Sequence, residues 1–321
     1  MQYRALGRTG LKVSEIGFGG WGIGGLTPGA TSYGDVDDSV SLRALRYATD
    51  LGVTFYDTSN LYGSGHSEEL IGKALADCRD RMVIATKVGR SDYDTEAYAP
   101  EQIRQSLEGS LRRLRTDYVD VIQVHSPSSL DILKRHEVME TLGRLKAEGK
   151  VRVIGISAKA PAEGIRAIDE LGAEVVQVNF NLVDQRATES GLLAVAERRG
   201  AGIVARTPLC FGMLSGKISP ETTFDARDHR SLWSPQQIAR WIEASNMFAK
   251  SVAQAHTQSQ AQIALRFCLS YSSVSTTIPG MLKAAEVEEN VCASDVGPLS
   301  DAELASIVAI YRGNDFFVRR Q

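Results

Sequence analysis

The sequence predicts an α/β protein: a single (β/α)8 barrel domain over residues 1–321, with an N-terminal β-hairpin and a long loop after strand 7. Two observations lead to this prediction. Eight short runs rich in β-branched residues alternate with segments of helical periodicity, as in a parallel sheet with crossover helices. No G-x-G-x-x-G follows the first strand, and this absence favours the barrel over a doubly wound nucleotide-binding sheet.

The eight predicted strands are short and largely apolar. They cover residues 16–19, 53–57, 82–87, 118–124, 151–157, 175–180, 202–206 and 274–279. The glycine-rich stretch 17–25 lacks the spacing of a nucleotide-binding turn, so we interpret it as a loop at the barrel mouth. Active sites of such barrels lie at the carboxyl ends of the strands, which makes the residues there the first functional candidates.

The predicted helices lie between these strands. The clearest covers residues 101–115, where Ile103, Leu107, Leu111 and Leu114 repeat on one face. Others are expected at residues 38–51, 67–77, 136–148, 162–171, 188–199 and 236–256, and four of these helices end at a glycine, at positions 52, 149, 172 and 200.

One long connection, residues 210–235, follows the seventh strand and is rich in Ser, Thr, Asp and Pro. Loops of this length are usually lids or binding loops. Together with residues 22–35, 89–99 and 126–135, it is expected to set substrate specificity at the mouth. Three histidines, at positions 136, 229 and 256, are expected at the surface.

Composition excludes several classes of protein. With 36 Lys+Arg against 39 Asp+Glu the net charge is −3, which argues against a nucleic-acid partner. No apolar stretch is long enough for a membrane span, and the first ten residues lack the apolar core of a signal peptide. Four scattered cysteines without CxxC spacing indicate reduced thiols in a cytoplasmic protein and no metal site: Cys78, Cys210, Cys268 and Cys292.

Three titratable residues of different types stand at the ends of neighbouring strands. Asp57 closes the second strand, Lys87 closes the third and His125 follows the fourth, while Tyr62 lies five residues beyond Asp57. Each alone has an ordinary interpretation as a cap, a snorkelling lysine, a satisfied polar group or a packed ring. Their convergence on one mouth favours an active site.

Seven segments, in order, resemble the aldo-keto reductase superfamily, in particular bacterial members near the potassium-channel β-subunit-like branch. The resemblance covers nearly the whole chain and is specific for fold and reaction type, but weak for substrate. Its segments are FYDTSNLYGSGHSEELIGKAL (55–75), IATKVG (84–89), DVIQVHSP (120–127), GKVRVIGIS (149–157), VVQVNFN (175–181), RTPLCFGMLSGK (206–217) and IPGMLKAAEVEEN (278–290).

The resemblance implies a catalytic tetrad of Asp57, Tyr62, Lys87 and His125. Hydride transfer to a carbonyl leaves a developing alkoxide that needs a proton and charge stabilisation. Tyr62 would supply the proton, Lys87 would stabilise the resulting phenolate, Asp57 would hold Lys87, and His125 would orient the carbonyl oxygen. A nicotinamide would supply the hydride, because no side chain can.

The resemblance also implies the cofactor contacts. Ser157 and Gln177 would hold the nicotinamide carboxamide. The pyrophosphate loop would be Thr207, Pro208, Leu209 and Gly212 with Lys217 as its cation, and the adenosine end would be Gly280, Met281, Leu282, Lys283, Glu286, Glu289 and Asn290. The set is completed by Gly20, Trp21, Asp57, Arg206 and Ile278.

Three departures from the family pattern bear on the cofactor. Ala158 replaces an asparagine that many members use for the carboxamide, and Arg206 replaces an aromatic ring that stacks on the nicotinamide. Leu282 and Glu286 stand where many NADPH-dependent members have polar or basic groups. Family habit therefore ranks NADP(H) slightly ahead of NAD(H), and the local residues leave NAD(H) a real alternative.

The function implied is NAD(P)H-dependent reduction of a small aldehyde, ketone or keto-sugar. An alternative is the oxidative direction, as a sugar or alcohol dehydrogenase. A regulatory cofactor-binding subunit is less favoured, since the channel subunits that resemble these enzymes lack the histidine present here as His125. A lyase or epimerase that recycles bound NAD(P) is a further alternative, and the oligomeric state stays open.

Overall fold

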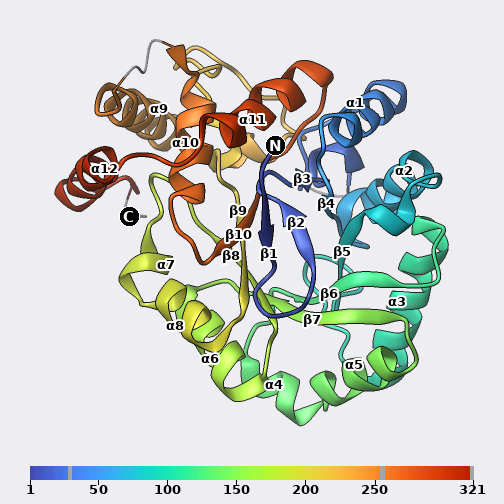
Figure 1. Ribbon diagram of the computed structural model, residues 1–321. Helices are drawn as coiled ribbons and strands as arrows, with labels where there is room; N and C mark the ends of the chain where they lie inside the picture. The colour runs from blue at the N-terminus through green and yellow to red at the C-terminus, as the bar shows by residue number, and fades with distance from the viewer. Residues whose placement is uncertain (28–30, 254–256, 319–321) are drawn as a thin grey trace.

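The computed structural model describes residues 1–27, 31–253 and 257–318, and its core is the predicted barrel of eight parallel strands (Figure 1). Every predicted strand is confirmed, with ends that differ by at most about two residues. In barrel order they are β3 (Phe18–Gly19), β4 (Phe55–Asp57), β5 (Val83–Val88), β6 (Val119–His125), β7 (Val151–Ser157), β8 (Val175–Asn179), β9 (Gly202–Arg206) and β10 (Val274–Ile278).

The barrel closes where β3 meets β10. Parallel bridges join Ile16 to Thr277 and Gly19 to Gly280 at this seam. A Cβ on Gly19 would lie 2.7 Å from the carbonyl oxygen of Ile278, so the close approach of the two backbones requires glycine there.

The predicted helices surround the barrel (Figure 1). The buried face expected for 101–115 is confirmed, since Ile103, Leu107, Leu111 and Leu114 are all buried, and all four glycines expected at helix ends adopt positive φ. The confirmed helices are α1 (Asp38–Asp50), α2 (His66–Ala74), α3 (Pro100–Leu114), α5 (Val138–Ala147), α6 (Pro161–Leu171), α8 (Leu192–Arg199) and α9 (Pro235–Lys250).

Several predicted boundaries were wrong. The helix expected at 188–199 is divided at Gly191, whose φ is 80°, into α7 (Arg186–Glu189) and α8. The segment 126–135, taken as a loop, contains α4 (Leu130–Arg135). The helix expected to reach residue 256 ends at Lys250, and the last part of that prediction, with His256, lies outside the described residues.

Three helices near the C-terminus were missed: α10 (Gln260–Leu269), α11 (Ala284–Val296) and α12 (Asp301–Gly313). Nearly all of α10 is buried, so it lacks the one-sided apolar stripe that reveals a surface helix. Helix α11 buries Asn290 and Ser294 among its apolar residues, which blurs its periodicity.

The N-terminal hairpin closes the end of the barrel where the strands begin, which is the end that faces the viewer in Figure 1. Strands β1 (Tyr3–Ala5) and β2 (Lys12–Ser14) pair antiparallel, as predicted. Three hairpin side chains complete one hydrophobic cluster with inward-facing residues of the barrel strands, so only the opposite end of the barrel is open. This cluster contains Leu6, Leu11, Val13, Phe55, Val83, Ala85, Val121, Val153, Val175, Val204 and Ile278.

Strand periodicity then places polar groups above this cluster. Side chains two residues apart share a face of a strand, so Val83, Ala85 and Lys87 line up inside the barrel. The same step leads from Phe55 to Asp57. The barrel interior is therefore apolar near the hairpin and polar at the open mouth, where the predicted site lies.

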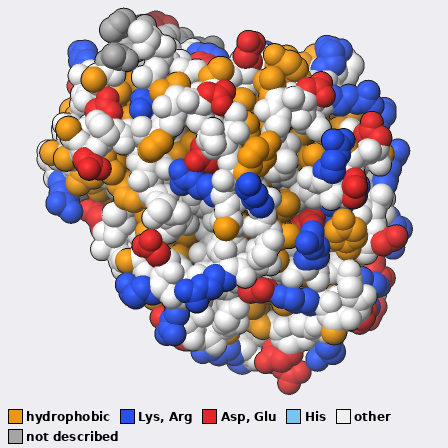
Figure 2. Space-filling view, viewed as in Figure 1, with side chains coloured by type: hydrophobic (Ala, Val, Ile, Leu, Met, Phe, Trp, Pro, Cys, Tyr) orange, Lys and Arg blue, Asp and Glu red, His pale blue; other side chains and the backbone are white. Residues whose placement is uncertain are grey.

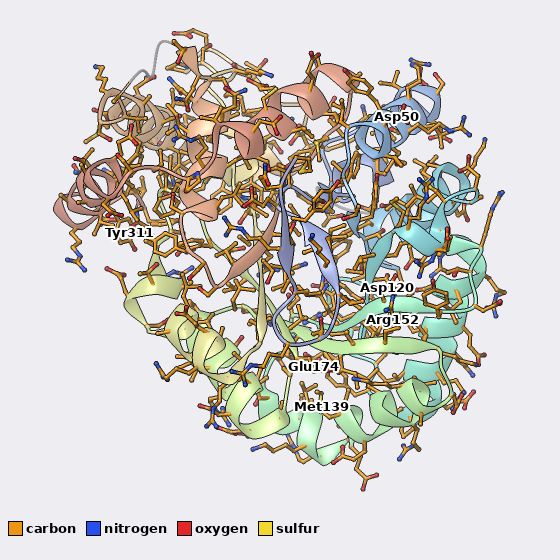
Figure 3. The ribbon with its side chains drawn as sticks, viewed as in Figure 1. Asp50, Asp120, Met139, Arg152, Glu174 and Tyr311 are labelled. Carbon is orange, nitrogen blue, oxygen red and sulfur yellow. The ribbon has the colours of Figure 1, made fainter. Side chains whose placement is uncertain are left out.

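On the hairpin side of the barrel, the Asp120 carboxylate links neighbouring strands. Asp120, labelled with Arg152 in Figure 3, accepts hydrogen bonds from Arg152 Nη1 at 2.7 Å and from the backbone N–H of Ile84 at 3.0 Å. Acidic and basic side chains are interspersed over this face (Figure 2), without a large field of one sign.

Within the described ranges, no helix is long and apolar enough to cross a membrane.

Candidate active site

The structure brings three of the predicted catalytic residues into direct contact. The fully buried ammonium of Lys87 donates to both oxygens of Asp57, at 2.7 and 2.9 Å, and to the backbone oxygen of Thr58 at 2.8 Å. It also lies 3.1 Å from the phenol oxygen of Tyr62. Because that oxygen accepts from Lys87, the Tyr62 hydroxyl proton can be donated to a group in the barrel mouth.

A tight turn holds Tyr62 in place. Tyr62 begins a 3-10 turn, Tyr62–Gly65, just after β4. Gly63 adopts a φ of 62°, and a Cβ there would lie 1.9 Å from the backbone oxygen of Gly24. Glycine is thus required at position 63 for the turn to pack against the loop after β3 and present the phenol to Lys87.

Asp57 is the centre of a longer hydrogen-bond chain. Its Oδ1 accepts from Gln177 Nε2 at 2.7 Å and from Gln123 Nε2 at 3.3 Å. Ser157 Oγ donates to Gln177 Oε1 at 3.3 Å, and Arg206 Nη1 donates to Ser157 Oγ at 3.2 Å. The chain connects Arg206 to Tyr62 through groups that are almost all buried, which fixes the geometry of the mouth.

His125, the fourth predicted residue, ends β6 and faces Tyr62. The two ring centroids are 6.1 Å apart and the planes lie nearly perpendicular, at 85°. Nδ1 of His125 lies 3.2 Å from Ser59 Oγ, which leaves Nε2 for a group in the mouth. The backbone oxygen of His125 accepts from Arg90 Nε at 3.0 Å.

Burial controls the protonation of the site. Burial and the Asp57 carboxylate raise the pKa of Tyr62, with Arg206 acting in the opposite direction, so the phenol is protonated at neutral pH. Burial lowers the pKa of Lys87, and Asp57 opposes that effect. Burial, Lys87 and Arg206 lower the pKa of His125 well below that of free histidine, which keeps the imidazole neutral.

The lowered pKa of His125 predicts a pH-dependent stability. Between the two pKa values the unfolded chain binds a proton that the folded protein does not, so stability is complete above about pH 6.5 and falls as the pH drops below it. We expect the His125→Gln variant to reduce the slope of unfolding free energy against pH, between pH 5 and 6.5, by up to about 1.4 kcal/mol per pH unit. Urea denaturation at several pH values measures this slope, and an unchanged slope would contradict the prediction.

A cavity of about 370 Å³ opens in front of Tyr62 and His125. A second cavity, of about 190 Å³, runs outward between the loop after β9 and helix α11. Tyr33, Phe211 and Gly280 line both cavities, so the two adjoin, and we refer to them together as the groove.

Most of the predicted cofactor residues line this groove. At the inner end are Trp21, Asp57, Gln177, Arg206, Thr207, Ile278 and Gly280. Along the outer part are Pro208, Leu209, Gly212, Lys217, Leu282, Glu286, Glu289 and Asn290.

Four predicted residues lie elsewhere. Met281 is fully buried in the hydrophobic core, and Gly20 lies behind the mouth, where its backbone oxygen accepts from Ser67 at 2.8 Å. Ser157 is buried beneath Arg206. Lys283 lines a separate side pocket next to Glu286, together with Asp35 and Asp37.

Several residues that line the inner cavity were not predicted from the sequence. Thr31 and Tyr93 line the inner cavity from two of the loops expected to set specificity, but neither residue stood out in the sequence. His229, expected at the surface, is half-buried and lines the cavity too. Of the loop 22–35, residues 28–30 lie outside the described chain.

The open parallel barrel has a buried lysine, a tyrosine and a histidine at its mouth, and this combination indicates an oxidoreductase. The model of the aldo/keto reductase family matches residues 15–312, and the chain belongs to this family.

Individual relatives differ in what their names describe. L-galactose dehydrogenase of Arabidopsis thaliana is 32% identical over 91% of this chain and 88% of its own length. A probable voltage-gated potassium channel subunit beta of Oryza sativa is 30% identical over 95% of this chain and 94% of its own. The solved structure of the glycerol dehydrogenase AKR11B4 from Gluconobacter oxydans superimposes with a TM-score of 0.80, at 29% identity over 97% of this chain and 96% of that one.

Proposed function

We propose that this protein is an NAD(P)H-dependent enzyme that reduces an aldehyde, ketone or keto-sugar to an alcohol, with Tyr62 as the general acid. The observation that carries the proposal is the position of Lys87 Nζ, 2.7 Å from the Asp57 carboxylate and 3.1 Å from the Tyr62 phenol. A buried ammonium in this place stabilises the phenolate left after proton transfer. The first test follows loss of reduced cofactor absorbance on addition of an aldehyde, and absence of turnover with any carbonyl would overturn the proposal.

The residues of the groove fit a nicotinamide dinucleotide. Among the described residues, Arg206 Nε has no hydrogen-bond partner although it is buried, and an unpaired donor at the cavity wall supports a polar ligand there. Its Nη2 donates to the backbone oxygen of Ala158 at 3.1 Å, which places the guanidinium beside the residues predicted to hold the carboxamide. The nicotinamide, when bound, supplies the hydride.

The chain's own residues then handle the oxygen of the substrate. Tyr62 gives its proton to that oxygen, and Lys87 stabilises the phenolate. If Ser59 donates to Nδ1, the neutral His125 ring carries its proton on Nε2. This N–H then donates a hydrogen bond to the same substrate oxygen. Tyr62, Lys87 and His125 together stabilise the negative charge that develops there.

The second candidate is the same chemistry in the oxidative direction. The names of two relatives, L-galactose dehydrogenase and glycerol dehydrogenase, favour it. Arg206 argues the other way, because a positive charge beside the nicotinamide disfavours the cationic oxidised cofactor over the neutral reduced one. We therefore keep reduction as the proposed direction.

A regulatory subunit is the third candidate, supported by the name of the potassium-channel relative. Asp57, Tyr62 and His125 line one cavity, and Lys87 is hydrogen-bonded to Tyr62 behind them. This complete set argues against a regulatory subunit, since a protein that only binds the cofactor has no need of a proton donor.

The outer end of the groove bears on the choice between NADP(H) and NAD(H). Glu286 Oε2 accepts from the backbone N–H of Leu282 at 2.8 Å, so the chain's own carboxylate takes a donor that could otherwise bind an anion. Asp35 and Asp37 line the adjoining pocket, and Lys283 lies 3.9 Å from Glu286. The Glu286 carboxylate at this end of the groove disfavours a 2′-phosphate, so we propose NAD(H) ahead of NADP(H), the reverse of the order that the family resemblance suggests.

Replacing Glu286 with arginine tests this preference. We expect the wild-type protein to bind NADH at least tenfold more tightly than NADPH. Glu286→Arg should reduce that ratio by about tenfold or more, because it replaces a negative charge near the 2′-phosphate with a positive one; a tenfold change corresponds to about 1.4 kcal/mol of binding free energy. Tryptophan fluorescence, sensitive to Trp21 in the cavity, measures both affinities. Glu288→Arg makes the same charge change at an exposed position of α11 and is the control. Tighter binding of NADPH by the wild type would contradict the proposal.

We also propose a cytoplasmic protein whose partner is a small-molecule substrate, with no nucleic-acid or membrane partner. All four cysteines are free, which fits a reducing compartment.

A further inference from the structure

The loop after β9 places a second imidazole in the substrate cavity. His229 lines the same cavity as His125 and Tyr62, although the sequence separates it from both by about a hundred residues or more. His125 ends β6 and His229 follows β9, three strands further along the barrel. The two imidazoles therefore enter the cavity from well-separated parts of its rim.

The position of His229 is fixed by contacts on both its backbone and its ring. Its backbone N–H donates to the oxygen of Ser32 at 2.7 Å, where Asp228 and Ser32 form a parallel bridge between two mouth loops. Its ring lies 5.2 Å from that of Phe211, 5.4 Å from that of Trp21 and 6.1 Å from that of Trp233. These contacts hold the ring at one place in the cavity wall.

The charges around the cavity limit what it can bind. Among the described residues that line it, Arg206 alone carries a permanent positive charge. That guanidinium already donates to Ser157 and to Ala158, and the proposed function places it beside the cofactor. Two further arginines adjoin the cavity, and both are engaged. Arg90 donates to the backbone oxygens of His125, Tyr93 and Ser126. Arg230, which stacks on Tyr33, pairs with the Asp228 carboxylate at 2.6 Å. A phosphorylated substrate would lack a cation of its own.

The remaining lining residues combine flat apolar surface with neutral hydrogen-bonding groups. Trp21, Phe211 and Tyr93 offer aromatic faces and edges, while Thr31 and Asn179 offer neutral polar groups. This combination suits a small uncharged molecule with hydroxyl groups.

We propose that the substrate is an uncharged hydroxylated aldehyde or ketone, of the aldose or ketose type, and that His229 binds one of its hydroxyl groups while His125 and Tyr62 bind the carbonyl oxygen. The inference rests on the proposed function, because it assumes that Tyr62 and His125 mark the reacting carbonyl. It adds the substrate class and a specificity-determining residue that the tetrad does not contain.

The test compares three aldehydes that differ in hydroxylation and charge: glyceraldehyde, propanal and glyceraldehyde 3-phosphate. We expect wild-type kcat/KM to be at least about tenfold higher for glyceraldehyde than for its phosphate. In His229→Phe, which keeps an aromatic ring in the cluster, kcat/KM for glyceraldehyde should fall about tenfold more than kcat/KM for propanal, because one hydrogen bond to the substrate is lost. His229→Gln retains a hydrogen-bonding group and should lose less of this selectivity.

Two controls separate the interpretations. His136→Phe changes an exposed histidine at the end of α4, outside the cavity, and should leave the selectivity at the wild-type value. Each variant is compared with the wild type on the same substrate, so differences in aldehyde hydration cancel. Binding of reduced cofactor to His229→Phe, followed by fluorescence, checks that the groove is intact.

Distinct results would overturn each level of the proposal. An unchanged ratio of glyceraldehyde to propanal in His229→Phe would remove the role of His229. A wild-type preference for glyceraldehyde 3-phosphate would overturn the substrate class. Absence of turnover with all three aldehydes and with other carbonyls would overturn the proposed function, and this inference with it.

Discussion

Replacing Tyr62 with phenylalanine is expected to lower kcat for carbonyl reduction by about 10²–10⁴-fold, the range typical of a lost general acid. The hydroxyl is the group that gives the proton, and its oxygen lies 3.1 Å from Lys87 Nζ. Because the ring is kept, the cavity retains its shape and the reduced cofactor should still bind. Steady-state turnover, together with fluorescence titration of the cofactor, separates loss of chemistry from loss of binding.

The matched control for this variant is Tyr56→Phe. Tyr56 is also buried and stands next to Asp57, but its hydroxyl bonds to Thr49 at 2.7 Å, outside the cavity. Removing that hydroxyl should lower stability modestly without a comparable loss of turnover. Full turnover by Tyr62→Phe would show that Tyr62 is not the general acid.

Replacing Lys87 with methionine is expected to remove activity and to destabilise the fold by about 3–5 kcal/mol. The substitution leaves the buried Asp57 carboxylate without its cation, and breaking a buried ion pair from one side carries a cost of this size. Tyr62 would also lose the positive charge that stabilises its phenolate. Urea denaturation measures the loss of stability, and turnover is measured under conditions where the variant remains folded.

The double variant Lys87→Met, Asp57→Asn distinguishes the two roles of the lysine. With the carboxylate also neutralised, most of the lost stability should return, because no unpaired charge is left in the interior. Turnover should not return, since the phenolate still has no cation. Recovery of activity in the double variant would mean that Lys87 acts only by holding the fold together.

Much of the barrel was predictable because local patterns determine it. Eight apolar runs became eight strands, and the polar residues at the ends of those runs necessarily share one mouth, because parallel strands in a barrel all point the same way. This is why Asp57, Lys87 and His125 could be placed together from the sequence, although their catalytic roles stay proposals. Two of the three missed helices, α10 and α11, lack a clear one-sided apolar stripe.

The sequence by itself therefore determined the barrel, its N-terminal hairpin and the strand ends that meet in the site. Only the tertiary structure decided three further features of the site: His229 in the cavity, Glu286 bonded to the Leu282 amide, and Arg206 linked to Ser157. Strand alternation fixes a side chain's direction from its neighbours in the chain. A loop residue is instead oriented by contacts with distant segments, such as the bond from His229 to Ser32, and no local periodicity encodes these contacts.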